Sequence, residues 1–173
     1  MTRSCLLALG SNLGDRLGYL RCAVQALRAH GLVLRSASGL WESEAWGGDA
    51  DRPYLNAVVE MGAAEDPWEL LALCKRLERE AGRDPGAERN APRCLDLDVL
   101  AVQGILLRSP SLSLPHPRMQ GRAFVWRPLA ELPDLERFQL GSPLPRGRGE
   151  LVRILGPEWI PAQGHSEGTE GQP

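Results

Sequence analysis

The order of strand-like and helix-like segments constrains the fold of this chain more than any other feature of its sequence. Four apolar or alternating segments predict strands, at residues 5–9, 32–41, 54–61 and 95–102. Apolar residues at helical spacing predict two helices, at 17–27 and from Asp66-Pro67 to Gly82. The order β-α-β-β-α-β predicts a ferredoxin-like α+β fold, in which an antiparallel four-stranded sheet carries both helices on one face. The open face of that sheet is the expected place for a functional site.

The remaining segments are shorter and less regular. Two loops that contain glycine or proline are predicted at 42–53 and 83–92. Short C-terminal elements follow: a part-helical segment at 122–132 and a last short helix at 151–155. We expect a single domain spanning 1–160. A disordered tail is expected at 161–173, because its small and polar residues cannot build a core.

Composition limits the classes of protein to which the chain can belong. Its 173 residues suffice for one domain with a sizeable core, and a formal charge of −2 argues against a dedicated binder of nucleic acid or membrane surfaces. No apolar run approaches the roughly 20 residues of a membrane span, and the N-terminus lacks the layout of a signal peptide. The cysteines are too dispersed for a zinc knuckle or a redox pair, so we expect reduced thiols in a cytoplasmic protein. Cys5, Cys22 and Cys74 lie in apolar, core-like settings.

Two aspartates in the last predicted strand, Asp96 and Asp98, indicate a metal site. Alternate residues of a strand share a face, which puts the two Cα atoms roughly 6.6 Å apart at about 3.3 Å per residue. Like charges this close on a half-buried strand repel each other and are costly to desolvate, and a cation relieves both costs. Oxygen ligands suit a hard ion such as Mg²⁺. The alternative is that both carboxylates are solvated and face water.

Basic residues near these aspartates suit a polyphosphate. Arg83, Arg89 and Arg93 lie in the loop before the strand, and guanidinium groups bind phosphate oxygens in a planar fork. His116 and Arg122 follow the strand and can donate to the same phosphates. Metal-bound phosphoryl chemistry is therefore the first hypothesis. The alternative is an ordinary solvated charge cluster, with His116 as a plain loop residue.

Tyr54, Asn56 and Phe124 form a candidate ring-binding set, with two aromatic faces and one amide that both donates and accepts. Composition alone favours a core role for the two aromatic residues. Trp46 lies in a Gly-rich loop, where a core role is less natural. The turn at 10–14 lacks the Lys-Ser/Thr ending of a Walker A phosphate loop, which favours a structural turn followed by a helix cap.

Together these motifs resemble the 6-hydroxymethyl-7,8-dihydropterin pyrophosphokinase family of folate biosynthesis, from about Leu6 to Leu135. The most specific block is Pro-Arg-Cys-Leu-Asp-Leu-Asp-Val-Leu at 92–100. The other shared blocks lie at 9–14, 54–57, 82–83, 115–116, 121–124 and 128–129.

The resemblance implies a ferredoxin-like diphosphotransferase that moves the terminal diphosphate of ATP to the pterin hydroxymethyl group and releases AMP, using two Mg²⁺ ions. It implies that Asp96 and Asp98 hold the ions and act in catalysis together with Arg83 and Arg93. The implied ATP contacts are Arg93, His116, Arg122 and Glu78, the last in a supporting role near the site.

The implied pterin pocket consists of Tyr54, Asn56 and Phe124, with the pterin stacked between the two aromatic rings. The loops at 42–53 and 83–93 are expected to close over ATP and exclude water. Asn90 departs from the tryptophan that the family often has in the second loop, and Pro85-Gly86 replaces positions that are often basic. Our hypothesis is that Trp46 supplies the missing aromatic contact to the substrate.

Two hypotheses from other classes remain open. A non-enzymatic ferredoxin-like module that binds RNA would need a basic surface with exposed aromatic residues. An inactive relative that only binds nucleotide is the second. Under the leading hypothesis the partners are ATP and a pterin, with no nucleic acid or membrane, and the protein is a monomer.

Overall fold

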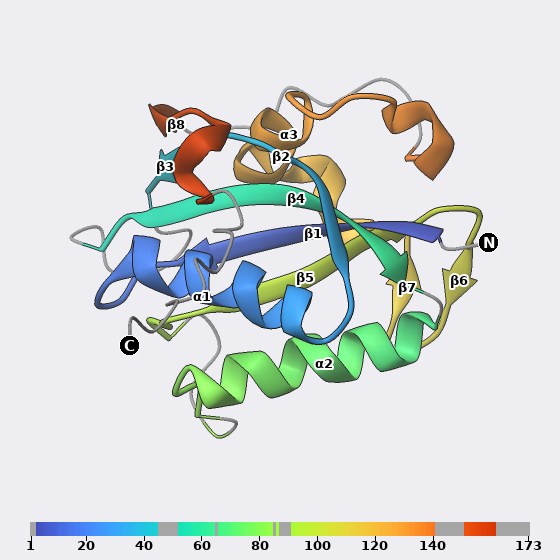
Figure 1. Cartoon of the computed structure of the whole chain (residues 1–173), viewed down its shortest axis with the longest axis horizontal. Helices are drawn as coiled ribbons and strands as arrows, with labels where there is room; N and C mark the ends of the chain where they lie inside the picture. The colour runs from blue at the N-terminus through green and yellow to red at the C-terminus, as the bar shows by residue number, and fades with distance from the viewer. Residues whose placement is uncertain are drawn as a thin grey trace, which may run out of the picture.

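The computed structural model describes residues 3–44, 52–64, 66–84, 86, 91–140 and 151–161. Three helices are α1 (Arg16–Ala29), α2 (Pro67–Glu80) and α3 (Ala123–Leu129), and three short 3₁₀ turns are η1 (Pro117–Gly121), η2 (Leu135–Phe138) and η3 (Pro157–Trp159). The strands are β1 (Arg3–Ser11), β2 (Val33–Ala37), β3 (Leu40–Ser43), β4 (Tyr54–Ala64), β5 (Asp96–Val102), β6 (Leu107–Arg108), β7 (Ser113–Leu114) and β8 (Leu151–Leu155). Figure 1 shows their arrangement.

Six of the strands form one antiparallel sheet in the order β5-β1-β4-β3-β8, with β2 also paired to β4. β1 lies between β4 and β5, and its apolar run is buried along most of its length. This central position explains why β1 reads as a continuous apolar segment rather than an alternating one. The predicted α+β class with an antiparallel sheet is confirmed.

Local signals fix the helix starts where the sequence places them. The Asp15 side chain accepts a hydrogen bond of 2.9 Å from the Gly18 N–H and caps α1. The Asp66 side chain accepts one of 2.7 Å from the Trp68 N–H and caps α2, which begins at Pro67. These caps satisfy N–H groups that a helix cannot pair internally.

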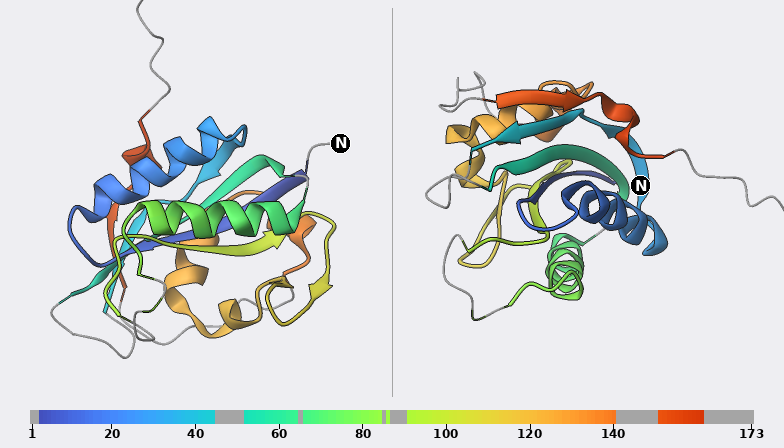
Figure 2. Two further views of the ribbon diagram at one scale, coloured as in Figure 1. Left: turned by 90° about the horizontal axis from the view of Figure 1, so that it is seen from below. Right: turned by 90° about the vertical axis from the view of Figure 1, so that its left-hand side faces the viewer.

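The sheet has a core on each face. α1 and α2 cover one face, and α3 lies on the other, as the views in Figures 1 and 2 show. The first core joins the apolar stripes of α1 and α2 to inward residues of β1 and β5, among them Leu20, Leu27, Leu73, Leu77, Leu7, Leu97 and Val99. The second packs α3 on the opposite face through Val125, Trp126, Leu129, Leu6, Val58 and Leu100. The face expected to be open is therefore partly covered by α3, which forms one wall of the site described below.

The single strand predicted at 32–41 is wrong, because it breaks into β2 and β3. The break lies at Ser38 and Gly39. The Ser38 hydroxyl accepts a hydrogen bond of 2.9 Å from the Val58 N–H, and the Gly39 N–H donates one of 2.8 Å to Glu131 Oε2. A Cβ at Gly39 would lie 2.4 Å from the Leu155 carbonyl oxygen, so glycine permits the close approach of the chain beyond it.

The short helix predicted at 151–155 is also wrong, because this segment forms strand β8. Leu151–Leu155 pairs antiparallel with β3, from Ser43↔Leu151 to Leu40↔Leu155. Five residues are too few for a stable isolated helix, whereas the edge of β3 offers backbone partners along the whole segment. The residues that follow are anchored by Trp159, whose Nε1–H donates to the Ser38 carbonyl over 2.8 Å.

Three further sequence predictions concern the cysteines, membrane-spanning helices and the C-terminal tail. All four cysteines are free, as predicted, but Cys22 is exposed rather than part of the core. Among the described residues, no helix is long and apolar enough to cross a membrane. The predicted disordered tail lies, beyond its first residue, outside the described residues.

Candidate active site

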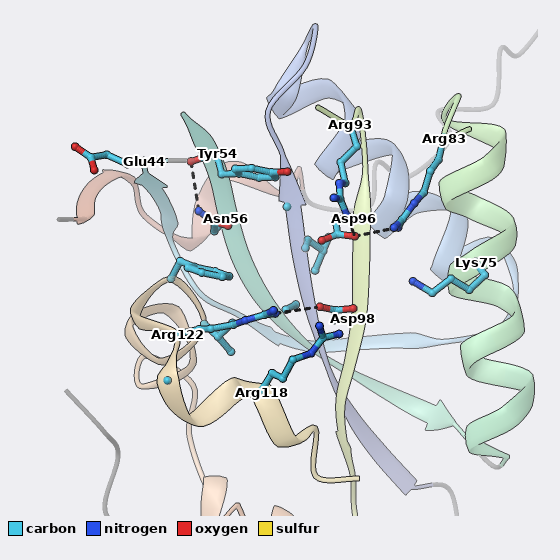
Figure 3. A pocket seen from close by; sticks show the side chains of 16 residues that line it. Glu44, Tyr54, Asn56, Lys75, Arg83, Arg93, Asp96, Asp98, Arg118 and Arg122 are labelled. Atoms are coloured by element: carbon cyan, nitrogen blue, oxygen red, sulfur yellow. Dashed lines mark hydrogen bonds and ion pairs between the residues drawn. The ribbon is translucent and has the colours of Figure 1, made fainter. Parts of the chain in front are cut away.

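A cavity of about 680 Å³ lies on the α3 side of the sheet, where β1, β4 and β5 run beneath α3 and the turn before it (Figure 3). This size is within the range of small-molecule sites. Its lining holds five basic side chains and three carboxylates, together with aromatic, amide and small residues. The basic residues are Lys75, Arg83, Arg93, Arg118 and Arg122, and the acidic ones are Glu44, Asp96 and Asp98. This excess of positive charge suits an anionic ligand.

Asp96 and Asp98 lie on the cavity side of β5, with Leu97 buried on the opposite face. The same-face arrangement predicted from the alternation of the strand is therefore confirmed. Their neighbours on β1 are small, since Asp96 pairs with Gly10 and Asp98 with Ala8. A Cβ at Gly10 would lie 3.6 Å from both Asn56 Oδ1 and Tyr54 Cδ1. Because glycine has no side chain, the backbone at Gly10 forms the floor of the cavity.

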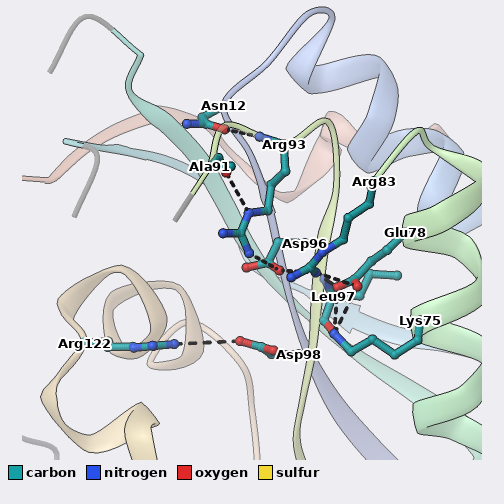
Figure 4. Close-up of polar contacts among 10 residues, drawn as sticks. All are labelled: Asn12, Lys75, Glu78, Arg83, Ala91, Arg93, Asp96, Leu97, Asp98 and Arg122. Atoms are coloured by element: carbon teal, nitrogen blue, oxygen red, sulfur yellow. Dashed lines mark hydrogen bonds and ion pairs between the residues drawn. The ribbon is translucent and has the colours of Figure 1, made fainter. Parts of the chain in front are cut away.

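Three arginines contact the two carboxylates (Figures 3 and 4). Arg83 Nη1 lies 3.0 Å and Arg93 Nη1 lies 3.1 Å from the same atom, Asp96 Oδ1. Arg122 Nη1 lies 3.8 Å from Asp98 Oδ2. The predicted grouping of Arg83, Arg93 and Arg122 around the aspartates is thus observed, while Arg89 lies outside the described residues.

The turn after β1 holds Arg93 in place, which the sequence did not indicate. Asn12 Oδ1 accepts a hydrogen bond of 2.8 Å from the Arg93 N–H, and the Asn12 N–H donates one of 3.2 Å to the Arg93 carbonyl. The cap of α1 is Asp15, directly after this turn. The expectation of a turn and helix cap at 10–14 was correct but incomplete, because this turn also positions a site arginine.

His116 lies beside the cavity rather than in its lining. Its backbone N–H donates to the Leu100 carbonyl over 2.7 Å, and its Nδ1 accepts a hydrogen bond of 3.2 Å from the Arg118 N–H. Burial lowers the pKa of His116 below its ordinary value, against the opposing effect of the Asp98 charge. The lowered pKa favours the neutral ring at pH 7, and acceptance at Nδ1 puts the ring proton of that form on Nε2 as its one N–H donor.

Tyr54, Asn56 and Phe124 all line the cavity, the first two from β4 and the third from α3. The Arg122 guanidinium carbon lies 5.6 Å from the centre of the Phe124 ring, within the range of a cation–π contact. Burial raises the pKa of the half-buried Tyr54 hydroxyl, and the nearby Arg93 charge opposes this rise. The core role that composition favours is therefore not observed for Tyr54, whereas the partly buried Phe124 both packs against the second core and lines the cavity.

The amide of Asn56 has a defined orientation. Its Nδ2 donates to Ser43 Oγ over 2.9 Å and to the carbonyl oxygens of Trp41 and Tyr54 over 3.3 Å each. Carbonyl oxygens only accept, so these contacts assign the amide nitrogen to this side. Asn56 Oδ1 then lies near Gly10 and presents an acceptor to the cavity floor.

Glu78 does not line the cavity but lies next to it, beneath Arg83. Its side chain is 1% exposed and its Oε2 lies 2.6 Å from Arg83 Nη1. Lys75, which no sequence motif indicates, forms an ion pair of 2.9 Å with Glu78 and reaches the cavity. Trp46 and Asn90 lie outside the described residues, which lack 45–51 of the first predicted loop and 85 and 87–90 of the second.

Within the described part of the chain, no group of three or more His, Cys, Asp or Glu side chains could hold a metal ion. The protein offers a pair of carboxylates instead. Mg²⁺ is commonly held by one or two protein carboxylates while phosphate oxygens and water complete its shell. The donor set on β5 therefore fits a hard cation that arrives with a phosphate ligand.

Comparison with known proteins places these residues in a family. Residues 6–134 match the family described as 7,8-dihydro-6-hydroxymethylpterin-pyrophosphokinase (HPPK). A 2-amino-4-hydroxy-6-hydroxymethyldihydropteridine pyrophosphokinase of Bacillus subtilis is 40% identical over 133 residues, which are 76% of this chain and 79% of the relative. A protein of the same name from Porphyromonas gingivalis is 37% identical over 130 residues, covering 73% of this chain and 88% of the relative.

Solved structures give a likeness in fold. A Plasmodium falciparum HPPK-DHPS, solved with pterin and p-hydrobenzoate, superposes with a TM-score of 0.52 at 13% sequence identity. The match covers 73% of this chain and 40% of that longer chain. At this identity the likeness concerns the fold alone.

Proposed function

The chain belongs to the 7,8-dihydro-6-hydroxymethylpterin-pyrophosphokinase family, and we propose that the cavity between the sheet and α3 is its active site. The protein is an ATP-dependent diphosphotransferase. It transfers the diphosphate of ATP to the hydroxymethyl group of 6-hydroxymethyl-7,8-dihydropterin, releases AMP, and acts in folate biosynthesis. Membership of this family does not favour the alternatives of an RNA-binding module or an inactive relative.

The strand order β5-β1-β4, with β2 and β3 both paired to β4, supports classification of the fold as ferredoxin-like.

The observation that carries the site assignment is that two kinds of side chain line one cavity. The β5 carboxylates with Arg83, Arg93 and Arg122 form a charged set, and Tyr54, Asn56 and Phe124 form an aromatic set with one amide. The charged set suits a polyphosphate, and the aromatic set suits a planar heterocycle. Diphosphate transfer requires both ligands side by side.

Arg93, Arg122 and His116 are the proposed ATP contacts, and Arg83 and Arg93 neutralise charge that develops during transfer. Phosphoryl transfer asks little covalent chemistry of the protein, so alignment and charge neutralisation dominate its contribution. The arginines now pair with Asp96 and Asp98. We propose that they exchange these partners for phosphate oxygens when ATP binds, and that His116 donates from Nε2. The resemblance also gives Glu78 a place near ATP.

Asp96 and Asp98 are the proposed ligands of two Mg²⁺ ions. When bound, such ions neutralise phosphate charge and help to align the attacking and leaving oxygens. Their carboxylate oxygens lie on the cavity side of strand β5, which suits them to this role.

Tyr54 and Phe124 are proposed to stack on the two faces of the pterin ring, with Trp46 as a further aromatic contact. Asn56 Oδ1 is the acceptor for a ring N–H. No protein nucleophile is required, since the pterin hydroxyl can attack the phosphorus directly. We propose that the enzyme works as a monomer in the cytoplasm, a compartment that suits its four free cysteines.

An assay with ATP, Mg²⁺ and 6-hydroxymethyl-7,8-dihydropterin tests the function. We expect AMP and the pterin diphosphate to form in equal amounts, measured by anion-exchange chromatography. Formation of ADP would instead identify a simple kinase. Binding of ATP without turnover of the pterin would favour an inactive relative and contradict the assignment.

Replacing Ser43 by alanine is expected to weaken pterin binding without changing ATP binding. The variant loses the Ser43 hydroxyl oxygen, which accepts a hydrogen bond of 2.9 Å from Asn56 Nδ2 and helps to orient the amide. One neutral hydrogen bond is worth about 1 kcal/mol, so the pterin KM should rise about fivefold. The KM for ATP should stay within about twofold on the same basis.

Ser43→Thr is the matched control, because threonine retains the hydroxyl acceptor. Its pterin KM should remain near that of the parent. Equal pterin KM values for Ser43→Ala and the parent would show that Ser43 does not orient the amide.

A further inference from the structure

Strand β5, which carries both site aspartates, lies at an edge of the sheet. Among the described strands β5 pairs with β1 alone in this sheet, through Gly10↔Asp96, Leu9↔Leu97 and Ala8↔Asp98. An edge strand presents unpaired backbone N–H and C=O groups, and its backbone is less restrained than that of a central strand. A site that needs two carboxylates in fixed positions is poorly served by a loose edge.

Two side chains of α2 occupy this edge at the residue between the aspartates (Figure 4). The Leu97 N–H donates a hydrogen bond of 2.8 Å to Glu78 Oε1. Lys75 Nζ donates to the Leu97 carbonyl over 3.4 Å. One carboxylate and one ammonium group thus supply the acceptor and the donor that a neighbouring strand would supply.

The two side chains also hold each other. Lys75 Nζ lies 2.9 Å from Glu78 Oε1 and 3.1 Å from Glu78 Oε2. The residues are three positions apart on one face of α2, where such pairs meet. The helix therefore presents a preformed donor and acceptor to the strand.

Glu78 links this edge to the arginines of the site. Its Oε2 pairs with Arg83, and Arg83 pairs in turn with Asp96 over 3.0 Å. Glu78 is 1% exposed, and its two cationic neighbours, Lys75 and Arg83, offset the cost of burying its charge. A buried ion pair adds little to stability compared with apolar packing, so geometry rather than stability is the better reason for this one.

We propose that Lys75 and Glu78 form a positioning pair for diphosphate transfer. They take the place of a strand beside β5, and they hold the Leu97 peptide, and with it Asp96, Asp98 and Arg83, in the geometry that the reaction needs. This inference rests on the proposed active site. Lys75 and Glu78 act through Leu97 and Arg83, without needing to contact the reacting atoms.

The test compares Lys75→Met, which removes the ammonium group, with Lys75→Arg, which retains a charged donor. We expect Lys75→Met to lower kcat at least about tenfold, since a displacement of about 1 Å can cost up to about a hundredfold. The pterin KM should be unchanged, and exchange of the Leu97 amide proton should accelerate at least about tenfold as the edge loosens. Lys75→Arg should restore most of kcat and the slow exchange.

Arg76→Met is the matched control on the same helix. Arg76 pairs with Glu80 over 3.9 Å, and both side chains are largely exposed, so neither kcat nor Leu97 exchange should change. A fall in kcat for Lys75→Met with unchanged Leu97 exchange would overturn the proposal and indicate direct contact with substrate. An unchanged kcat would overturn it as well.

The proposed function and the proposed positioning pair can be contradicted independently of each other. If the parent protein makes no AMP, the assigned function fails, while the exchange of Leu97 in the three variants still tests the pair. If Lys75→Met does not fold, Lys75→Gln retains a shorter donor without charge and is expected to show the same changes in smaller degree. Parent-like kcat and exchange in Lys75→Gln would then contradict the proposal.

Discussion

Asp96→Asn and Asp98→Asn are each expected to lower kcat by at least about a thousandfold, or about 4 kcal/mol of transition-state stabilisation. Each amide keeps the shape of the side chain but lacks the charge that binds a hard cation. The change also removes the carboxylate that Arg83 and Arg93 share, or the one that Arg122 contacts. The rate of AMP formation at saturating ATP and pterin measures the loss.

The fold should survive both changes, because each side chain is about 30% exposed rather than part of the core. Thermal unfolding temperatures within a few degrees of the parent would establish this. Asp134→Asn is the matched control: its side chain is 79% exposed, and asparagine tolerates the left-handed backbone at that position. Parent-like kcat in either site variant would remove that aspartate from the proposed metal site.

Features that depend on neighbours along the chain could be predicted from the sequence. Alternation in 95–102 places Asp96 and Asp98 on one face, and Asp66-Pro67 marks a helix start that residue type alone predicts. The grouping of Arg93 with Asp96 follows from a separation of three residues. In each case the interacting groups are close in sequence, so local geometry determines the contact.

Features that depend on distant partners could not be predicted. Asn12 and Arg93 are 81 residues apart, and their contact exists only because β1 and β5 pair in one register. The break between β2 and β3 depends on Glu131, which is 92 residues from Gly39. β8 became a strand because the edge of β3 was available to it, although its five residues carry no decisive local signal.

Dependence on distant partners also explains why the sequence did not place some of the cavity-lining residues. Tyr54 and Phe124 are aromatic, and composition favours the core for such residues, yet the small residues Gly10 and Ala8 leave a cavity beside them. Lys75 lies inside the helix predicted from Asp66-Pro67 to Gly82. Its role depends on α2 lying against the edge of β5, which no local pattern reveals.

Arg93→Lys is expected to lower kcat about a hundredfold although the charge is kept. The Arg93 side chain is 17% exposed, its Nη1 lies 3.1 Å from Asp96 Oδ1, and its Nε donates to the Ala91 carbonyl over 3.3 Å. A guanidinium group can make these contacts and bind a phosphate at once because its five N–H groups point in fixed directions. An ammonium group has three donors at one point, so it cannot hold Asp96, Ala91 and a phosphate oxygen in the same geometry.

The contributions of charge and of guanidinium shape at Arg93 can be separated by steady-state rates of AMP formation. The variants compared are Arg93→Lys, Arg93→Met and the control Arg79→Lys. Arg93→Met should lose about tenfold more than Arg93→Lys, because it also removes the charge that faces the phosphates. Arg79 is exposed on α2, and its replacement should leave kcat unchanged. If Arg93→Lys retained parent-like kcat, charge alone would suffice at this position. The hydrogen bonds from Asn12 to the Arg93 backbone would then serve to place a charge and not a directed set of donors.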